Sequence, residues 1–497
     1  MSLDDRDLLS IQEARNLARK AKTAQIILAE FNESQVDQIL KAMVKAASQN
    51  AVRLAEMAVS DTGFGKVKDK AFKNEFASTI LYEYIKDMKT IGIISEDKEK
   101  KLIEIAEPMG VLMGIIPSTN PTSTIIFKSI IALKARNGIV FSPHPSALSC
   151  SMEAARLMHD AAVAAGAPEG IIACMSKPSM EGTDALMHAP EIALIIATGG
   201  SAMVKSSYSS GKPALGVGPG NVPAYIEKTA DIEKAVRNII ASKTFDNGTI
   251  CASEQSVIVE SAYRDRIVAE FKRQGAYFMS PEETAIVSKT LFTGNFAMNS
   301  QMMGRNPQEI ARKAGISIPE GTTVLLGEQK GVGREYPLSF EKLTTVLAFY
   351  CVEDWKEACD LCIKLIHNGG VGHSISIHTE DRDMVLKFAT KPVFRILVNS
   401  PSSQGGVGAS TALAPSFTLG SGTWGGSSTS DNVTPLHLIN IKRIAYGIKD
   451  VTSSQPVIGS SDSLSKVGKT GSITEEQVTA IVGEVLKRMT NQGGLNG

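Results

Sequence analysis

The sequence predicts an α/β fold with two domains, each built on a parallel sheet. Three observations indicate this. Short apolar runs bounded by Gly or Pro alternate with helical segments, the runs are continuous rather than alternating, and the pattern resumes after residue 251. Strands and helices at this spacing are typical of βαβ units, and continuous apolar strands are expected where both faces of a sheet are buried. A length of 497 residues fits two domains, which we expect to meet near residue 245, and an appendage.

The expected elements follow in order along the chain. Residues 10–60 are expected to be helical, with apolar residues at helical spacing over 34–59. In the first α/β segment we expect strands at 110–118, 139–141, 171–174 and 193–197, and helices over 122–136, up to residue 165 and from about residue 202. In the second we expect strands at 255–260 and 346–352, and helices over 262–274 and 354–367.

The charge balance excludes some partners. Lys plus Arg equals Asp plus Glu, at 52 each, so the chain has no general attraction for nucleic acid or an anionic membrane. No secretory signal is readable in the first ten residues, and no apolar run approaches the roughly 20 residues that span a bilayer. The six cysteines are scattered, as is typical of reduced thiols. We therefore expect a cytoplasmic protein.

The segment TFDNGTICASEQSVIV places Cys251 among small and polar residues, just before a predicted strand. A thiol becomes a nucleophile where backbone N–H groups or cations stabilise its thiolate. The small neighbours Gly248, Thr249, Ala252 and Ser253 would let a substrate approach. A buried structural cysteine is the alternative, and for an isolated cysteine it is the more common outcome.

Three further segments carry weaker signals. Thr198, Gly199 and Gly200 end an apolar strand before a predicted helix, a turn that can hold a pyrophosphate or be only a tight turn. Asn120, between a strand and a helix, could donate to a developing oxyanion or simply start the helix. Residues 142–145 (SPHP) hold no acid for a ribose 2′-hydroxyl, so discrimination against a 2′-phosphate is not evident.

Metal chemistry is not expected. Cys359 and Cys362 form C-x-x-C inside a predicted helix, on or near its apolar face, and no second ligand pair exists. Core packing is therefore favoured over redox chemistry or zinc. The seven histidines show no metal-ligand spacing.

Four long segments together resemble one family. They are EPMGVLMGIIPSTNPTSTIIFKSIIALKARN, ATGGSAMVKSSYSSGKPALGVGPGN, SKTFDNGTICASEQSV and SQGGVG, and they resemble the CoA-acylating aldehyde dehydrogenases over about residues 10–448. Similar proteins include the aldehyde half of bifunctional aldehyde–alcohol dehydrogenases and the propionaldehyde and acetaldehyde dehydrogenases of bacterial microcompartments. The resemblance implies an aldehyde dehydrogenase-like α/β fold with a Rossmann-type cofactor domain and an α/β catalytic domain. It also implies NAD and coenzyme A as cofactors.

The resemblance also implies roles for particular residues. Cys251 matches the nucleophile, and Asn120 matches the oxyanion amide that acts with the Cys251 backbone N–H. His373 matches a histidine near the active site and could deprotonate the incoming thiol. The residues that match cofactor contacts are Thr198, Gly199 and Gly200 at the pyrophosphate, His144 near the adenosine ribose and Glu341 at the nicotinamide ribose.

One departure from the hydrolytic members of the superfamily predicts the acyl acceptor. Their ELGG glutamate activates water, whereas the shared Leu-Gly here puts Ala214 at that position, and no acid occurs from residue 211 to residue 226. Coenzyme A could then outcompete water. We therefore expect a short-chain aldehyde, propionaldehyde or acetaldehyde, to be oxidised to acyl-CoA. The alternatives are a hydrolytic enzyme and a non-catalytic microcompartment cargo protein.

The expected domains are a cofactor domain at 1–245, a catalytic domain at 246–435, and a returning segment at 436–450 that serves oligomerisation as a dimer or tetramer. Residues 451–471 have the Ser- and Gly-rich composition of a flexible linker. Residues 472–490 predict an amphipathic helix with one apolar stripe. This helical tail resembles an encapsulation peptide, which implies a shell protein as partner and a location inside a bacterial microcompartment.

Overall fold

The computed structural model describes residues 5–294 and 296–449. The chain divides into a large compact unit, residues 1–95 with 103–443, and a small unit, residues 96–102 with those from 444 onward. The predicted linker at 451–471 and the predicted helix at 472–490 lie outside the described residues.

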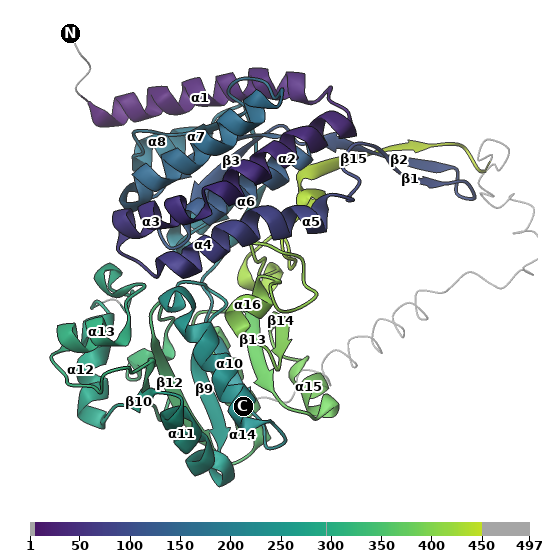
Figure 1. Ribbon diagram of the computed structural model, residues 1–497. Coiled ribbons are helices and arrows are strands. Elements are labelled where there is room, and N and C mark those ends of the chain that lie inside the picture. The colour runs from purple at the N-terminus through teal and green to yellow at the C-terminus, as the bar shows by residue number, and fades with distance from the viewer. Residues whose placement is uncertain (1–4, 295, 450–497) are drawn as a thin grey trace, which may run out of the picture. The chain divides into compact units, whose positions relative to one another are not determined.

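The first α/β segment forms a five-stranded parallel sheet in the order β5-β4-β3-β6-β7 (Figure 1). Four of its strands had been expected from the apolar runs, and each is longer or shorter by a few residues than its run. β7 was not expected. The strands are β3 (Val111–Ile116), β4 (Gly138–Pro143), β5 (Ile172–Cys174), β6 (Ile192–Thr198) and β7 (Ala214–Val217).

Both faces of this sheet are buried, as the continuous apolar runs predict. Adjacent residues of β3, such as Leu112 and Met113, belong to different core clusters, one on each face of the sheet. One face packs against α2, α6 and α7, and the other against α1, α8 and α9. The helices are α1 (Arg6–Leu28), α2 (Glu33–Gln49), α6 (Pro121–Lys134), α7 (Leu148–Ala164), α8 (Met180–Met187) and α9 (Ser201–Ser209).

The helical stretch at 34–59 is two helices rather than one. Asn50 leaves the helical conformation, with φ −109° and ψ 9°, and its side-chain amide donates to Ala46 O at 2.9 Å. An Asn side chain that bonds the preceding turn is a common way to end a helix. The segment therefore divides into α2 and α3 (Ala51–Thr62), which are followed by α4 (Val67–Glu75), one π-helical turn (Phe76–Ile80) and α5 (Leu81–Ile85).

The second α/β segment forms a seven-stranded parallel sheet in the order β10-β11-β12-β9-β8-β13-β14. Helices α10 and α11 cover one face and α12 to α15 the other. Its strands are β8 (Val222–Ile226), β9 (Glu254–Glu260), β10 (Ala276–Phe278), β11 (Val324–Glu328), β12 (Val346–Val352), β13 (Gly372–His378) and β14 (Val393–Val398). Its helices are α10 (Ile232–Thr244), α11 (Arg264–Arg273), α12 (Pro281–Leu291), α13 (Pro307–Ala314), α14 (Trp355–His367), α15 (Arg382–Phe388) and α16 (Ser402–Gly406).

After α16 the chain returns to the first sheet. The side-chain amide of Asn137, just before β4, donates to the carbonyl of Leu438 at 2.8 Å and is fully buried. The last strand, β15 (Ile439–Ala445), follows at once in a three-stranded sheet of order β1-β2-β15, with β1 (Gly92–Asp97) and β2 (Leu102–Pro108). This sheet was not expected from the sequence, because β1 and β15 are largely exposed, β2 is half-buried and none of the three has a continuous buried run.

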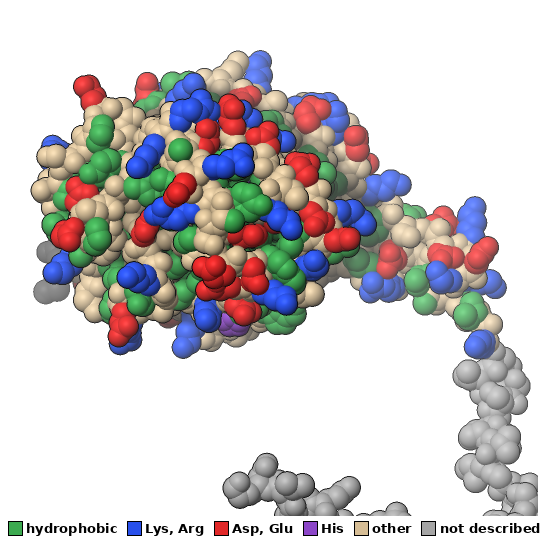
Figure 2. Space-filling view, turned by 90° about the horizontal axis from the view of Figure 1, so that it is seen from below, with side chains coloured by type: hydrophobic (Ala, Val, Ile, Leu, Met, Phe, Trp, Pro, Cys, Tyr) green, Lys and Arg blue, Asp and Glu red, His purple; other side chains and the backbone are tan. Residues whose placement is uncertain are grey.

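The surface shown in Figure 2 mixes basic and acidic side chains without a large area of one sign, in keeping with the balanced composition. Among residues 5–294 and 296–449, no helix combines the length and the apolar character needed to cross a bilayer.

Candidate active site

A cavity of about 910 Å³ lies where β3, β4 and β6 end. The loops that follow these three strands all line it, through residues 117–120, 144–146 and 199–200. Parallel sheets bind ligands at the carboxyl ends of their strands, where the loops converge. Residues 249–251 complete the wall, so the loop before β9 faces the strand ends of the first sheet.

The structure brings most of the sequence-predicted residues together at this cavity. The exception among them is His373, which is fully buried and does not line the cavity. Its Nε2 nevertheless lies 3.2 Å from Cys251 Sγ, so it reaches the cavity only through the thiol. The residues that line the cavity are Cys251, Asn120, Thr198, Gly199, Gly200, His144 and Glu341.

The turn at the end of β6 is sterically open and contains a polar atom without a hydrogen-bond partner among the described residues. The Oγ1 of Thr198 is buried and has no hydrogen-bond partner among the described residues. A Cβ added to Gly199 or Gly200 would meet nothing within 4 Å, and α9 begins at the next residue. An open helix N-terminus beside an unpaired hydroxyl fits a dinucleotide pyrophosphate. His144, after β4, accepts from the N–H of Ser146 at 3.2 Å, and burial lowers the pKa of His144, so this ring is neutral at neutral pH.

The resting thiol and imidazole are both uncharged. Burial raises the pKa of Cys251 to about 12, the Glu341 carboxylate adds to the rise, and Arg395 opposes it. Burial lowers the pKa of His373 to about 3, and the cation of Arg395 adds to that shift. His373 is therefore a neutral ring at neutral pH, with its Nε2 within hydrogen-bond distance of the thiol.

Arg395 is a buried cation whose charge acts on Cys251, and the sequence reading missed it. It lies on β14, beside Ser374 of β13, and its guanidinium is 3% exposed. It donates to the carbonyls of His373 at 3.3 Å and Gly420 at 2.7 Å, and to Asn432 Oδ1 at 2.7 Å. These acceptors are neutral, and the anionic groups that act on Arg395 electrostatically are the Cys251 thiolate and Asp431. A lone Arg in an apolar strand carries no local signal of this role.

Glu341 lies on the other side of the thiol. Its Oε1 accepts from the N–H of Gly220 at 3.1 Å, and burial raises the pKa of Glu341 to about 7. Gly220 is required here, because a Cβ at this position would lie 2.0 Å from the carbonyl oxygen of Cys251. The loops that hold Glu341 and Cys251 therefore approach each other through a glycine.

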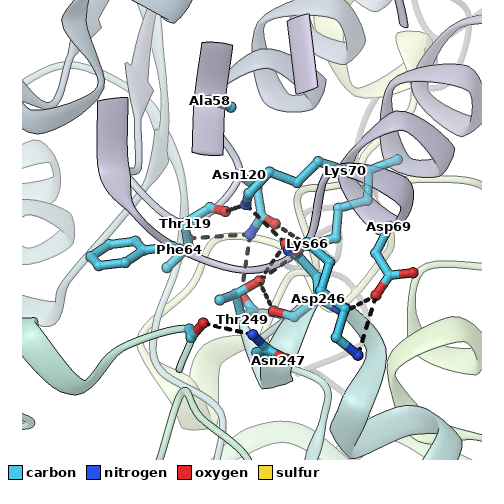
Figure 3. Close-up of polar contacts among 12 residues, drawn as sticks. Ala58, Phe64, Lys66, Asp69, Lys70, Thr119, Asn120, Asp246, Asn247 and Thr249 are labelled. Carbon is cyan, nitrogen blue, oxygen red and sulfur yellow. Dashed lines mark hydrogen bonds and ion pairs between the residues drawn. The ribbon is translucent and has the colours of Figure 1, made fainter. Parts of the chain in front are cut away.

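Asn120 is held by a buried cluster that the sequence reading also missed (Figure 3). Its Nδ2 donates to the carbonyl of Thr249 at 3.2 Å, and its Oδ1 accepts from Lys73 of α4 at 2.5 Å. Lys73 and Lys70 both form ion pairs with Asp246, which is fully buried. In sequence these lysines lie in a segment, KVKDKAFKNE, that has the composition of a solvated helix.

The structure corrects the position of Ala214. Its side chain is buried in the core of the first sheet at the start of β7 and does not line the cavity. The residues of this stretch that do line the cavity are Val217, Gly218 and Pro219. The cavity-lining residues of this stretch thus follow Ala214 by three to five positions. The stretch from residue 211 to residue 226 still brings no carboxylate to the thiol.

The C-x-x-C pair packs as expected. Cys359 and Cys362 lie on α14, and both belong to the buried core of the second sheet. Both are free thiols.

Cys251, Asn120 and the glycine turn after β6 thus share one cavity, and the neutral ring of His373 lies 3.2 Å from the thiol. The model of the aldehyde dehydrogenase family matches residues 7–303. The succinate-semialdehyde dehydrogenase (acetylating) of Clostridium kluyveri is 38% identical over 438 residues, covering 88% of this chain and 96% of that protein. The chain belongs to the aldehyde dehydrogenase family.

Longer relatives match as well. The bifunctional aldehyde-alcohol dehydrogenase of Escherichia coli (strain K12) is 47% identical over 442 residues, 88% of this chain and 50% of that protein. The chain thus spans about half the length of the bifunctional relatives it matches.

Solved structures share the fold. An acetylating aldehyde dehydrogenase from Geobacillus thermoglucosidasius is 52% identical, with a TM-score of 0.89 over 90% of this chain and 99% of that one. A propionaldehyde dehydrogenase from a Clostridium phytofermentans fucose utilisation microcompartment is 28% identical, with a TM-score of 0.78 over 86% and 96%. A Rhodopseudomonas palustris propionaldehyde dehydrogenase with bound propionyl-CoA is 28% identical, with a TM-score of 0.79 over 87% and 94%.

Proposed function

We propose that this protein oxidises a short-chain aldehyde with NAD and transfers the acyl group from Cys251 to coenzyme A. The observation that carries the proposal is the single cavity shared by Cys251, Asn120 and the Thr198 turn, with His373 Nε2 3.2 Å behind the thiol. Relatives at 38% and 52% identity that are named acetylating support it.

The chain's own residues divide the work. Cys251 Sγ adds to the aldehyde carbonyl, and His373 takes the thiol proton. Asn120 and the Cys251 N–H receive the oxyanion. Bound NAD, held by the Thr198 turn, supplies the hydride acceptor. Cys251 then carries an acyl thioester, which the thiol of coenzyme A attacks to release acyl-CoA and restore the free cysteine.

The acceptor follows from the missing base. In the hydrolytic enzymes a glutamate of the matching stretch activates water, and residues 211–226 of this chain hold no acid that could take that part. A related structure holds propionyl-CoA, which supports coenzyme A as acceptor in this chain too. A hydrolytic enzyme that releases free acid is the second candidate, and its only support is that hydrolytic aldehyde dehydrogenases have the same fold as this chain. A non-catalytic cargo protein is a third, and the intact Cys251, Asn120 and Glu341 argue against it.

Acetaldehyde and propionaldehyde are the proposed substrates. The cavity near the thiol is lined by apolar side chains, including Val407, Phe417 and Leu419. Arg305 is the arginine among the described residues that line it, and this side chain already pairs with Glu309 at 3.3 Å. A carboxylate- or sulfonate-bearing aldehyde would find no unpaired cation there, which favours uncharged aldehydes.

The test is NADH formation from acetaldehyde, propanal and succinate semialdehyde, each with and without coenzyme A, in the wild type and in Cys251→Ala. We expect turnover that depends on coenzyme A, highest with the uncharged aldehydes, and a loss of more than about a hundredfold in Cys251→Ala with NAD binding unchanged. Abundant free acid in the presence of coenzyme A would favour the hydrolytic enzyme. No NADH from any aldehyde would favour the cargo protein.

We further propose a cofactor domain at 1–245 with 436–450, a catalytic domain at 246–435, and assembly as a dimer or tetramer. The tail at 472–490 would bind a shell protein and bring the enzyme from the cytoplasm into a microcompartment, as the microcompartment relative supports. Deletion of residues 472–497 should leave turnover within about twofold and abolish co-purification with shells. Retained co-purification, or loss of turnover, would assign the segment to the enzyme's own structure.

A further inference from the structure

We infer that Lys73 is a positioning residue for the oxyanion amide of Asn120, and that Asp246 holds Lys73 in place for this task. The inference rests on the proposed function, because it assigns Lys73 a part in the attack of Cys251 on a carbonyl. It adds to the site a residue from α4 that touches neither the thiol nor the substrate.

The ammonium of Lys73 has three donors and three buried acceptors. It donates to Asn120 Oδ1 at 2.5 Å, Asp246 Oδ2 at 2.5 Å and Thr249 Oγ1 at 3.2 Å. The side chain is 2% exposed, so water does not compete for these bonds. Every proton of the group is therefore committed, and its position is fixed from three directions.

This arrangement sets the direction of the Asn120 amide. An Asn side chain can exchange its oxygen and nitrogen by a half turn. An ammonium can only donate hydrogen bonds, so it pairs with the amide oxygen and not with the amide nitrogen. With Oδ1 held by Lys73, Nδ2 must point away from Lys73, where it donates to the carbonyl of Thr249 and to Thr119 Oγ1, each at 3.2 Å. An oxyanion would accept in place of one of these two partners. Thr249 lies two residues before Cys251, so the N–H₂ group faces the catalytic loop, the direction from which an oxyanion would accept a bond.

The bond also changes the strength of the donor. A hydrogen bond from a cation to an amide oxygen withdraws charge through the amide and makes its N–H protons better donors. Burial lowers the pKa of Lys73 to about 8, while the Asp246 carboxylate opposes that shift, so Lys73 stays cationic at neutral pH. A preorganised donor of this kind stabilises developing charge at no cost of reorganisation during the reaction.

Asp246 is anchored independently of Lys73. Its Oδ1 accepts from the N–H of Lys66 at 2.7 Å, and its own N–H donates to Asp69 Oδ2 at 2.8 Å (Figure 3). Its backbone is left-handed, with φ 47°, a conformation that non-glycine residues rarely adopt and that is concentrated at functional sites. Gly65 leaves the space that Asp246 fills, since a Cβ there would lie 1.8 Å from Oδ1.

The test is a double-mutant cycle on cysteine acylation. The probe is p-nitrophenyl acetate, whose burst of nitrophenol reports attack of Cys251 on a carbonyl without NAD. We expect Lys73→Met to slow the burst about 10- to 100-fold, and Asn120→Ala to slow it about 100- to 1000-fold. In the Asn120→Ala background, Lys73→Met should cost less than about threefold, because the amide it positions is gone.

Two further measurements separate positioning from general damage. Alkylation of Cys251 by iodoacetamide passes through no oxyanion, so Lys73→Met should leave its rate within about twofold after the Cys251→Ala background is subtracted. Lys73→Gln, which keeps an N–H donor, should recover part of the burst. Lys134→Met is the matched control: Lys134 is equally buried on α6 but donates to the Lys86 carbonyl away from the cavity, so the burst should be unchanged.

Each outcome decides the inference. Equal losses from Lys73→Met with and without Asn120, or parallel losses in the burst and in alkylation, would overturn it. A burst in Lys73→Met equal to the wild type would overturn it as well. These failures differ from failure of the proposed function, in which wild-type protein would give neither a Cys251-dependent burst nor NADH from any aldehyde.

Discussion

Arg395 offers a direct test of how the resting thiol is controlled. Its guanidinium is buried on β14, donates to neutral acceptors and has no carboxylate partner within salt-bridge distance among the described residues. Replacing it by Met removes the cation and four donated bonds, to the carbonyls of His373, Gly420 and Ser430 and to Asn432. Replacing it by Lys keeps the charge but loses the planar fork that reaches several acceptors at once.

The expected cost follows from those bonds. A buried acceptor left without its donor costs about 1–3 kcal/mol. The two bonds of 2.7 Å, to Gly420 and Asn432, carry most of the loss, and about 1 kcal/mol is regained because Met avoids burying a cation. We therefore expect Arg395→Met to lower the free energy of unfolding by about 3 kcal/mol and Arg395→Lys by about half of that.

Urea unfolding at pH 7.5 measures the stability, and iodoacetamide alkylation of Cys251 measures the electrostatic effect. Arg395 opposes the rise in the pKa of Cys251, so Arg395→Met should raise that pKa further and slow alkylation at fixed pH about three- to tenfold. Arg395→Lys should alkylate at close to the wild-type rate. If Met and Lys slow alkylation equally, the charge is not what acts on the thiol. An unfolding free energy that is unchanged in Arg395→Met would refute the stability loss expected from the lost hydrogen bonds.

Two other substitutions test the acceptor choice and the buried charge. Gly218→Glu places an acid in the cavity, where an added Cβ meets nothing within 4 Å. It should raise the ratio of free acid to acyl-CoA at least about tenfold. An unchanged ratio with NADH formation intact would argue that a missing base does not explain the choice of coenzyme A over water. Burial raises the pKa of Glu254 to about 7, so the folded protein binds this proton more tightly than the unfolded chain does, and the stability it contributes is lost as pH rises through about 7. Glu254→Gln should therefore stabilise by about 1–3 kcal/mol at pH 8.5 and little at pH 5 in urea unfolding, and equal effects at both pH values would contradict the shift.

The strands that pack on both faces were readable from the sequence because burial forces continuous apolar runs. The strand expected at 346–352 is β12, and the helix expected over 122–136 is α6 within two residues at each end. The strands β1 and β15 were not readable, since their side chains are mostly exposed and local composition then carries no signal. The edge strand β7 was missed because its four residues, ALGV, are too short to show a period.

The same distinction separates the site residues that the sequence predicted from those that it did not. Cys251 and the Thr198 turn are recognisable because their chemistry depends on immediate neighbours in the chain. Lys73 contacts Asn120 and Asp246, 47 and 173 residues away, and Arg395 contacts the carbonyl of His373 on an adjacent strand. Such roles exist only after the chain has folded, and before that a lysine in a charged helix looks solvated.

The buried contact between Asn137 and Leu438 has a consequence for synthesis. The two residues are 301 positions apart, and the Asn137 side chain also accepts from the N–H of Gly110 at the entrance of β3. At a ribosomal rate of about 5–20 residues per second, Asn137 emerges roughly 15–60 s before Leu438. Contacts between residues so far apart in sequence slow folding, and the surface around Asn137 stays uncovered meanwhile. The nascent first sheet should therefore be a client of chaperones until the segment that carries Leu438 has left the ribosome.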